Sequence, residues 1–140
     1  MDEKTKNFIK EKQVKNYVEN VCKIESQSKI LIIFITGITS ECRPCEKGTI
    51  ALIDSIYEFK NLSGFSKYII ISDNNKDSYK CIKSDSFTVL PVSQYAIQKH
   101  GIDFPYNFVI EFDNKYKIIY WESLVSSKFK DIYNELSVMF

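Results

Sequence analysis

Apolar residues along the chain change between helical and strand-like spacing, which is typical of an α/β protein. From residue 3 to about 25, apolar residues recur at three- or four-residue steps among Lys and Glu, so the pattern predicts an amphipathic N-terminal helix. Residues 30–35 form an almost continuous β-branched and aromatic run, as in a strand covered by helices on both faces. Helical spacing returns from Cys45 to Phe59, and residues 65–71 predict a second buried strand.

The second half of the chain predicts shorter elements. They are a short helix at 79–82, a short edge strand or an extended segment at 87–90 that Pro91 stops, a helix at 93–99, strands at 106–112 and 116–121 joined by a turn at 113–115, and a helix from Glu122 onward. This order implies a mixed sheet with helices on both faces. We divide the chain into an N-terminal helix, 1–28, packed on a domain formed by 29–140.

Composition and charge narrow the range of functions. The formal net charge is +1, with 19 basic and 18 acidic residues, so the chain lacks the electrostatic footprint of a nucleic-acid or anionic-membrane binder. The longest apolar run, 30–35, is too short to span a bilayer. The segment Met1-Asp2-Glu3-Lys4 lacks the apolar core of a signal peptide, which favours the cytoplasm unless a leader has been removed.

The main chemical signal is Cys42-Arg43-Pro44-Cys45, at the change from the first strand to a helix. Unpaired N–H groups and the dipole at a helix N-terminus favour a thiolate, which lowers a cysteine pKa from about 8.5 to roughly 3.5–7.5. Arg43 adds a cation, and Pro44 suits a first helical turn because it has no N–H to lose. Glu41 opposes ionisation of Cys42. Because the two-residue spacing lets Cys45 reach Cys42, the motif predicts a redox-active dithiol.

Other interpretations of the cysteines stay open at this point. A C-x-x-C can be half of a zinc site, but such a site needs two further ligands, and Cys22, Cys81 and His100 are single and scattered. Two inert cysteines with accidental spacing are a further alternative. We interpret Cys22 and Cys81 as small buried hydrophobes, with a regulatory disulfide as the alternative, and His100 as a turn or surface residue. We predict no metal site.

The order of motifs resembles the thioredoxin superfamily, most of all the TlpA-like thiol–disulfide oxidoreductases of the bacterial cell envelope. The similarity runs from Ile30 to Trp121, about two-thirds of the chain. After the C-x-P-C motif and its helix, three more segments carry it: Phe87-Thr88-Val89-Leu90-Pro91, Gln98-Lys99-His100-Gly101-Ile102, and Phe104-Pro105-Tyr106-Asn107-Phe108-Val109-Ile110.

The resemblance implies a thioredoxin-like fold with an extra N-terminal helix. It also implies that Pro105 is a cis-proline facing the dithiol, and that Phe104 offers its backbone to a bound substrate segment. The implied partners are a protein substrate with a disulfide or dithiol and an upstream redox partner, with no metal or organic cofactor. The implied compartment is the periplasm or cell envelope if a leader has been removed.

The chain departs from the family pattern at three positions. Glu41 stands where an aromatic residue usually precedes the first cysteine, and Phe104 stands where Thr or Val is common. Thr36 replaces the buried Asp of thioredoxins. These departures leave the substrate, the rate and the direction of the reaction open.

Two alternatives concern the chemistry. Thr39 and Cys42 give the T-x-x-C of peroxiredoxins, but Ile35 stands where that family has Pro, which favours the oxidoreductase. We therefore predict thiol–disulfide exchange in which Cys42 attacks, Cys45 resolves, and Glu41, Arg43 and Pro44 tune the redox potential. The alternative is a thioredoxin-like binding, adaptor or metal-handling domain without redox turnover.

Overall fold

The computed structural model describes residues 3–24, 28–38, 43–56, 58–59, 64–75, 79 and 87–138, with only the backbone described for 3–9, 43–44 and 138. The helices are α1 (Glu3–Asn16), α2 (Arg43–Ile56), α3 (Gln94–Lys99) and α4 (Phe129–Val138), with a π-helical turn η1 (Tyr17–Val21) and a 3-10 turn η3 (Ser126–Lys128). The strands are β1 (Lys29–Ile35), β2 (Phe65–Ser72), β3 (Thr88–Val92), β4 (Phe108–Phe112) and β5 (Ile118–Ser123).

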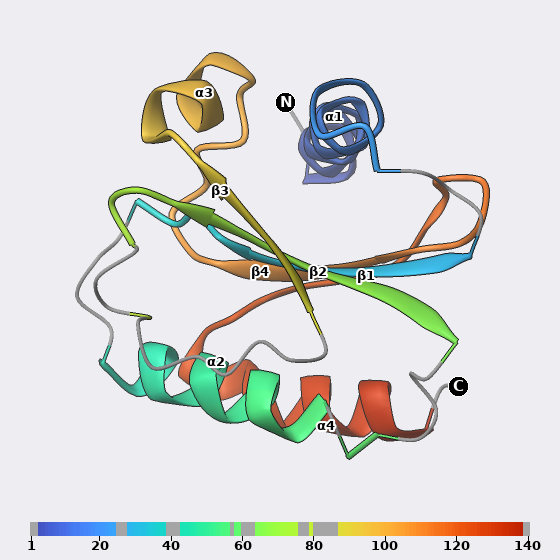
Figure 1. Ribbon diagram of the computed structural model, residues 1–140, viewed down its shortest axis with the longest axis vertical. Coiled ribbons are helices and arrows are strands. Elements are labelled where there is room, and N and C mark those ends of the chain that lie inside the picture. Colours follow the sequence, from blue (N-terminus) through green and yellow to red (C-terminus); the bar gives the residue numbers. More distant parts are fainter. Residues whose placement is uncertain are drawn as a thin grey trace.

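The strands form one mixed sheet in the order β3-β2-β1-β4-β5. β1, β2 and β3 run parallel, whereas β4 is antiparallel to both β1 and β5. Figure 1 shows α1 and α3 on one face of the sheet and α2 and α4 on the other. This architecture confirms the predicted mixed sheet flanked by helices.

The central strand β1 is buried on both faces, which explains its unbroken apolar run. The six side chains of 30–35 are all 0% exposed. They alternate between the two core clusters, because successive side chains of a strand point to opposite faces. Leu31, Ile33 and Ile35 pack with residues of α2 and α4, while Phe34 on the other face stacks on Phe108 with ring centroids 4.4 Å apart.

The N-terminal helix packs on the sheet through its carboxyl-terminal part. Val14, Tyr17 and Val18 are each at most 1% exposed and share a core cluster with Ile32 and Phe34. The predicted packing of this helix is therefore observed for the described side chains. The division of the chain at residue 28 stays a prediction.

Element boundaries differ from the sequence prediction at two strands. β3 continues through Pro91 to Val92 instead of ending at the proline. It can do so because β3 is an edge strand, where a missing N–H leaves no neighbouring strand without a partner. β5 extends to Ser123, and α4 begins only at Phe129, so the final helix starts later than Glu122. Helical spacing in the segment before Phe129 therefore reflects a buried Leu124 rather than a helix.

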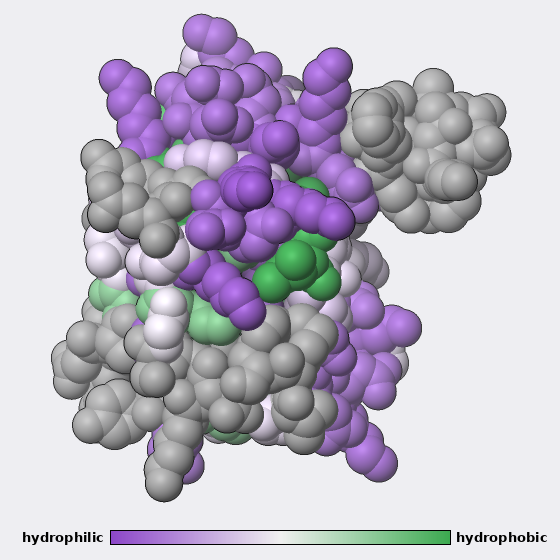
Figure 2. All heavy atoms as spheres, turned by 90° about the vertical axis from the view of Figure 1, so that its right-hand side faces the viewer, coloured by the Kyte–Doolittle hydropathy of each residue, from purple (hydrophilic) through white to green (hydrophobic). Residues whose placement is uncertain are grey.

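Among the coloured residues in Figure 2, hydrophilic ones predominate, and hydrophobic ones show as a dark green patch with paler green areas elsewhere. The large apolar side chains that are exposed among the described residues are Val21, Ile38, Val89, Tyr95 and Tyr106. Within the described ranges, no helix combines the length and the apolar character that crossing a membrane requires.

Candidate active site

The predicted site residues come from two segments that lie at the same end of the sheet, because α2 follows the end of β1 and the antiparallel β4 begins there. Arg43, Pro44 and Cys45 form the first turn of α2, which follows the carboxyl end of β1. Phe104 and Pro105 lie in the loop between α3 and β4. Glu41 and Cys42 fall outside the described residues, so their arrangement stays a prediction.

Cys45 is the described member of the dithiol motif. Its residue is 8% exposed, and its sulfur is disulfide-bonded rather than free. The Cys45 carbonyl accepts a 2.8 Å hydrogen bond from Thr49 Oγ1, one turn further along α2, and Thr49 is completely buried. This bond joins two successive turns of α2 on its buried side. Because Cys42 and Cys81 are not among the described residues, the pairing of Cys42 with Cys45 stays a prediction.

Cys22 is a free thiol. It is half-buried beside the core, and burial raises its pKa above the ordinary value, with a smaller opposing effect from a hydrogen bond with Tyr17. A raised thiol pKa reduces the thiolate fraction at neutral pH, and with it the reactivity. These features agree with the interpretation of Cys22 as a small hydrophobe.

A polar network joins the loop after β1 to the start of β4. The Gly37 N–H donates to Asn107 Oδ1 at 2.8 Å, and Asn75 Nδ2 donates to the Gly37 carbonyl at 3.2 Å. A Cβ on Gly37 would lie 2.7 Å from the Asn107 backbone nitrogen, so only glycine allows this close approach. The Ile38 N–H also donates to the Phe104 carbonyl at 3.2 Å. These contacts hold the loop of Phe104 against the segment that leads from β1 toward α2.

Tyr79 extends this network. Asn107 Nδ2 donates to the Tyr79 hydroxyl at 3.0 Å. Tyr79 is 7% exposed, and burial, reinforced by the nearby Glu46 carboxylate, raises its pKa. The phenol therefore stays protonated at neutral pH and acts as a hydrogen-bonding group. No sequence motif predicted a role at the site for Tyr79, Asn107 or Asn75, because the sequence pattern assigned Tyr79 to a short helix and Asn107 to a strand.

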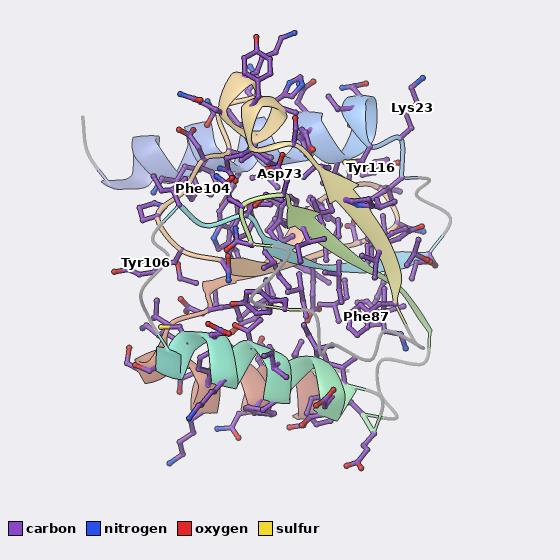
Figure 3. All side chains as sticks on the ribbon, turned by 60° about the vertical axis from the view of Figure 1, so that its left-hand side comes forward. Lys23, Asp73, Phe87, Phe104, Tyr106 and Tyr116 are labelled. Carbon is purple, nitrogen blue, oxygen red and sulfur yellow. The ribbon has the colours of Figure 1, made fainter. Side chains whose placement is uncertain are left out.

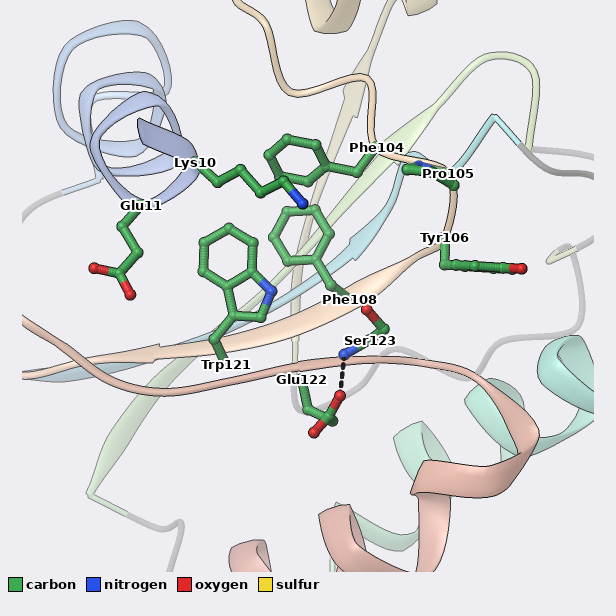
Figure 4. Close-up of a pocket in the computed structure, with 9 residues that line it drawn as sticks. All are labelled: Lys10, Glu11, Phe104, Pro105, Tyr106, Phe108, Trp121, Glu122 and Ser123. Atoms are coloured by element: carbon green, nitrogen blue, oxygen red, sulfur yellow. Dashed lines mark hydrogen bonds between the residues drawn. The ribbon is translucent and has the colours of Figure 1, made fainter. Parts of the chain in front are cut away.

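A pocket of about 430 Å³ lies beside Phe104 and Pro105. Its floor is aromatic: the Phe108 and Trp121 rings stack with centroids 5.0 Å apart, and the Phe104 ring lies 5.8 Å from Trp121. Lys10 of α1 places its Nζ 5.7 Å from the centre of the Phe104 ring. Figure 4 shows the three rings grouped around the end of the Lys10 side chain, with Tyr106 pointing away from them. Figure 3 shows Phe104 and Tyr106 on the side of the molecule where α2 begins.

The expected cis-proline is not found. Phe104 and Pro105 are both described, and no peptide bond among the described residues is cis. The trans form is intrinsically favoured by about 0.5–1 kcal/mol for a bond preceding proline. The contacts of Phe104, namely its carbonyl with Ile38 and its ring with Phe108, are made with this trans bond in place.

Thr36 and His100 are two further positions that the sequence analysis discussed. Thr36 is 1% exposed, and its hydroxyl has no hydrogen-bond partner among the described residues. No ionisable group therefore stands at the position that corresponds to the buried Asp of thioredoxins. His100 lies in the turn after α3 with its ring 5.3 Å from that of Tyr17, as expected for a turn residue.

Among the described side chains, no group of three or more His, Cys, Asp or Glu residues is arranged to hold a metal ion.

Comparison with known proteins identifies the fold. No protein-family model matches the chain, and no curated protein matches it in sequence. Solved structures that match include StoA from Bacillus subtilis, at 16% identity over 79% of this chain and 84% of that chain, with a TM-score of 0.53. A secreted disulfide oxidoreductase of Mycobacterium tuberculosis, described as homologous to E. coli DsbE, matches at 9% identity over 82% of this chain and 84% of that one, with a TM-score of 0.55.

A third solved structure, the thioredoxin domain of a thiol–disulfide oxidoreductase from Bacteroides vulgatus, matches at 16% identity over 79% of this chain and 81% of that chain, with a TM-score of 0.51. These similarities, together with the strand order, show that the chain has the thioredoxin-like fold predicted from its sequence. At such low identity they establish the fold alone. The chemistry of this chain has to be argued from its own residues.

Proposed function

We propose that the protein is a thiol–disulfide oxidoreductase that exchanges disulfides with protein substrates through Cys42 and Cys45. The observation that carries this proposal is the position of the C-x-P-C motif, whose last three residues open α2 directly after the buried parallel strand β1. Backbone N–H groups at the start of a 14-residue helix favour a thiolate on the preceding cysteine. Arg43 and Pro44 would tune the redox potential of the pair from within this turn, and Glu41 would oppose them.

The reaction is reversible exchange of one disulfide for another. The Cys42 thiolate attacks a substrate disulfide, forms a mixed disulfide and releases one substrate thiolate. The Cys45 thiolate then attacks the Cys42 sulfur and releases the second substrate thiolate. The substrate has gained two electrons, and the protein holds the Cys42–Cys45 disulfide. A dithiol of an upstream partner returns the two electrons, so no metal or organic cofactor is needed.

Substrate docking would use the Phe104–Pro105 segment. Pro105 is exposed and Phe104 is half-buried at the edge of the aromatic pocket, so a polypeptide can approach both. The Phe104 carbonyl already accepts a hydrogen bond from Ile38, which limits how its backbone can pair with a substrate strand. Apolar contact with the aromatic floor would then contribute to docking.

Replacement of the two cysteines tests the proposal. Cys42→Ser should abolish reduction of a disulfide-bonded test protein such as insulin, because the attacking thiolate is gone. Cys45→Ser should accumulate a mixed disulfide between Cys42 and the test protein, visible by mass spectrometry, because the resolving thiol is missing. Cys22→Ala is the matched control and should keep wild-type activity. Undiminished exchange by Cys42→Ser would exclude this mechanism, whereas a wild type without any exchange would favour a binding or adaptor domain.

A further inference from the structure

The aromatic pocket beside Phe104 is one end of a longer groove between α1 and β5. Figure 4 shows this pocket between Glu11 on α1 and Trp121 on β5. A second cavity, of about 420 Å³, lies further along the same two elements. Because Glu11 lines both cavities, they form one continuous depression, which we call the α1–β5 groove.

The groove leads away from the proposed active site along β5. Residues 121–123 line the aromatic pocket, and residues 115–118 line the second cavity, which reaches the turn between β4 and β5. At about 3.3 Å per residue, the path from 118 to 123 is roughly 17 Å long. β5 is the outer strand of the sheet, and none of its residues is buried. An extended segment of roughly five or six residues therefore fits along the groove.

The second cavity concentrates positive charge. Its lining includes one carboxylate, Glu11, and four lysines that are all exposed to solvent: Lys12, Lys15, Lys115 and Lys117. The formal net charge of the whole chain is only +1, so these lysines are a local excess rather than part of a generally basic surface. Such a cluster attracts a partner of negative charge and orients it.

The turn that carries two of these lysines is fixed in place. The Asp113 carboxylate accepts hydrogen bonds from the backbone N–H groups of Lys115 at 2.8 Å and Lys117 at 2.9 Å. Between them, the Tyr116 hydroxyl donates to the Ile24 carbonyl. The Asp113 charge offsets part of the positive charge, but the lysines remain in excess. Because this backbone is already ordered, binding costs less conformational entropy.

We propose that the α1–β5 groove is a subsite for an acidic segment of the substrate polypeptide. A large apolar side chain near the substrate disulfide would enter the aromatic pocket, and acidic side chains about five residues further along would meet the lysines. This inference rests on the proposed function, because it takes Phe104 and Pro105 as the end of the groove beside the reacting cysteines. The near-zero net charge of the chain favours a polypeptide over a nucleic acid as the occupant.

Two matched peptides test this subsite. Each carries the same disulfide with an adjacent Phe, followed after a short spacer by a run of Glu in one peptide and of Gln in the other. The reduced wild type should exchange with the Glu peptide about tenfold faster, in second-order rate constant, at low salt. This advantage should shrink at high salt, because salt screens charges at the surface. Trp121 is the only tryptophan, so its fluorescence should also report binding in the aromatic pocket.

Lysine variants on the two sides of the cavity locate the effect. Lys115→Gln/Lys117→Gln on the turn and Lys12→Gln/Lys15→Gln on α1 should each reduce the advantage of the Glu peptide over the Gln peptide by about threefold to tenfold, since each removes two exposed charge pairs. Using two independent pairs guards against a local structural effect of either one, and thermal melts establish that each variant is folded.

The matched control removes two exposed lysines from the opposite face of the sheet. Lys128 and Lys130 lie in η3 and α4, away from α1. Lys128→Gln/Lys130→Gln lowers the net charge by the same amount and should keep the wild-type advantage of the Glu peptide. An equal loss in this control would show that net charge alone, and not the groove, selects the peptide, and would overturn the inference.

The remaining outcomes separate this inference from the proposed function. If the wild type exchanges equally fast with both peptides, or if both groove variants keep its preference, the inference is wrong and the proposed function stands. A single-stranded oligonucleotide that displaces the Glu peptide from the wild type at lower concentration than free Glu peptide does would overturn the assignment to a polypeptide. A wild type that exchanges with neither peptide overturns the proposed function and, with it, the substrate role of the groove.

Discussion

Glu111 is an acidic side chain buried inside the sheet. It lies on β4, opposite Leu31 of β1 and Tyr120 of β5, and is 0% exposed. Neither carboxyl oxygen has a hydrogen-bond partner among the described residues. Burial raises its pKa from 4.5 to about 8, the Glu135 carboxylate adds to this rise, and Lys29 opposes it. Glu111 is therefore protonated in the folded protein at neutral pH.

This raised pKa predicts a pH-dependent stability. Between pH 4.5 and about 8 the folded state binds more protons at Glu111 than the unfolded state. The free energy of unfolding should thus be highest below this window and fall as the pH rises through it, by several kcal/mol. Glu111→Gln should flatten the fall and be more stable than the wild type at pH 9, as measured by urea unfolding at pH 5, 7 and 9.

The control for this prediction is Glu58→Gln, at an exposed position. It should leave the pH dependence of the wild type in place. A wild type whose stability does not change between pH 5 and 9, or a Glu111→Gln variant with the same slope as the wild type, would show that Glu111 does not titrate in this way.

At the scale of elements, the contact between α2 and α4 depends on Gly48. A Cβ built on Gly48 would lie 2.7 Å from Cδ2 and Cζ of the Phe129 ring. Phe129 is only 9% exposed and belongs to the core cluster on this face, so its ring has little room to move. The glycine therefore lets the first half of α2 approach the start of α4 closely.

This contact predicts an effect opposite to helix propensity. Gly48→Ala should lower the free energy of unfolding by about 1–2 kcal/mol, because overpacking costs about 1–3 kcal/mol and outweighs the helix gain of up to about 1 kcal/mol. At the exposed position Ala51 of the same helix, Ala51→Gly should follow ordinary propensity and destabilise by about 1 kcal/mol. Urea unfolding of both variants measures the contrast.

A second substitution identifies the cause. If the Phe129 ring is what the new methyl group meets, Gly48→Ala should cost less in a Phe129→Leu background than in the wild type. An equal cost in both backgrounds, or a stabilised Gly48→Ala single variant, would show that the helices can separate without penalty.

Strands were predictable from sequence where burial on both faces left a simple pattern. The run 30–35 predicted β1 correctly because none of these six side chains faces water. For β3 the predicted edge position is confirmed, but its predicted end at Pro91 was wrong, since a proline is tolerated within an edge strand. The burial of Glu111 was not predictable from the sequence either. A carboxylate in a strand suggests an exposed face, whereas α4 covers that face here.

At the scale of the whole molecule, the order of elements predicted the mixed sheet with helices on both faces, and the resemblance of the motifs to the thioredoxin superfamily predicted the thioredoxin-like fold. That the C-x-P-C motif at the start of α2 carries the chemistry stays a prediction. The supporting residues were not predictable in the same way. Asn107 and Tyr79 lie 28 positions apart, and Asn107 and Gly37 lie 70 apart. Polar loop residues follow no period, so only the folded chain reveals that they meet.

The central claim is that Cys42 and Cys45 form a redox-active pair, and their reduction potential tests it most directly. The protein would be equilibrated with glutathione buffers of graded ratio, its thiols trapped by alkylation, and the Cys42–Cys45 peptide quantified by mass spectrometry. The account predicts a reversible two-electron transition. A potential near about −270 mV would mark a reductant, and one near about −120 mV an oxidant. If no Cys42–Cys45 disulfide forms at any ratio, the claim is contradicted, and a binding or metal-handling domain becomes the better account of this chain.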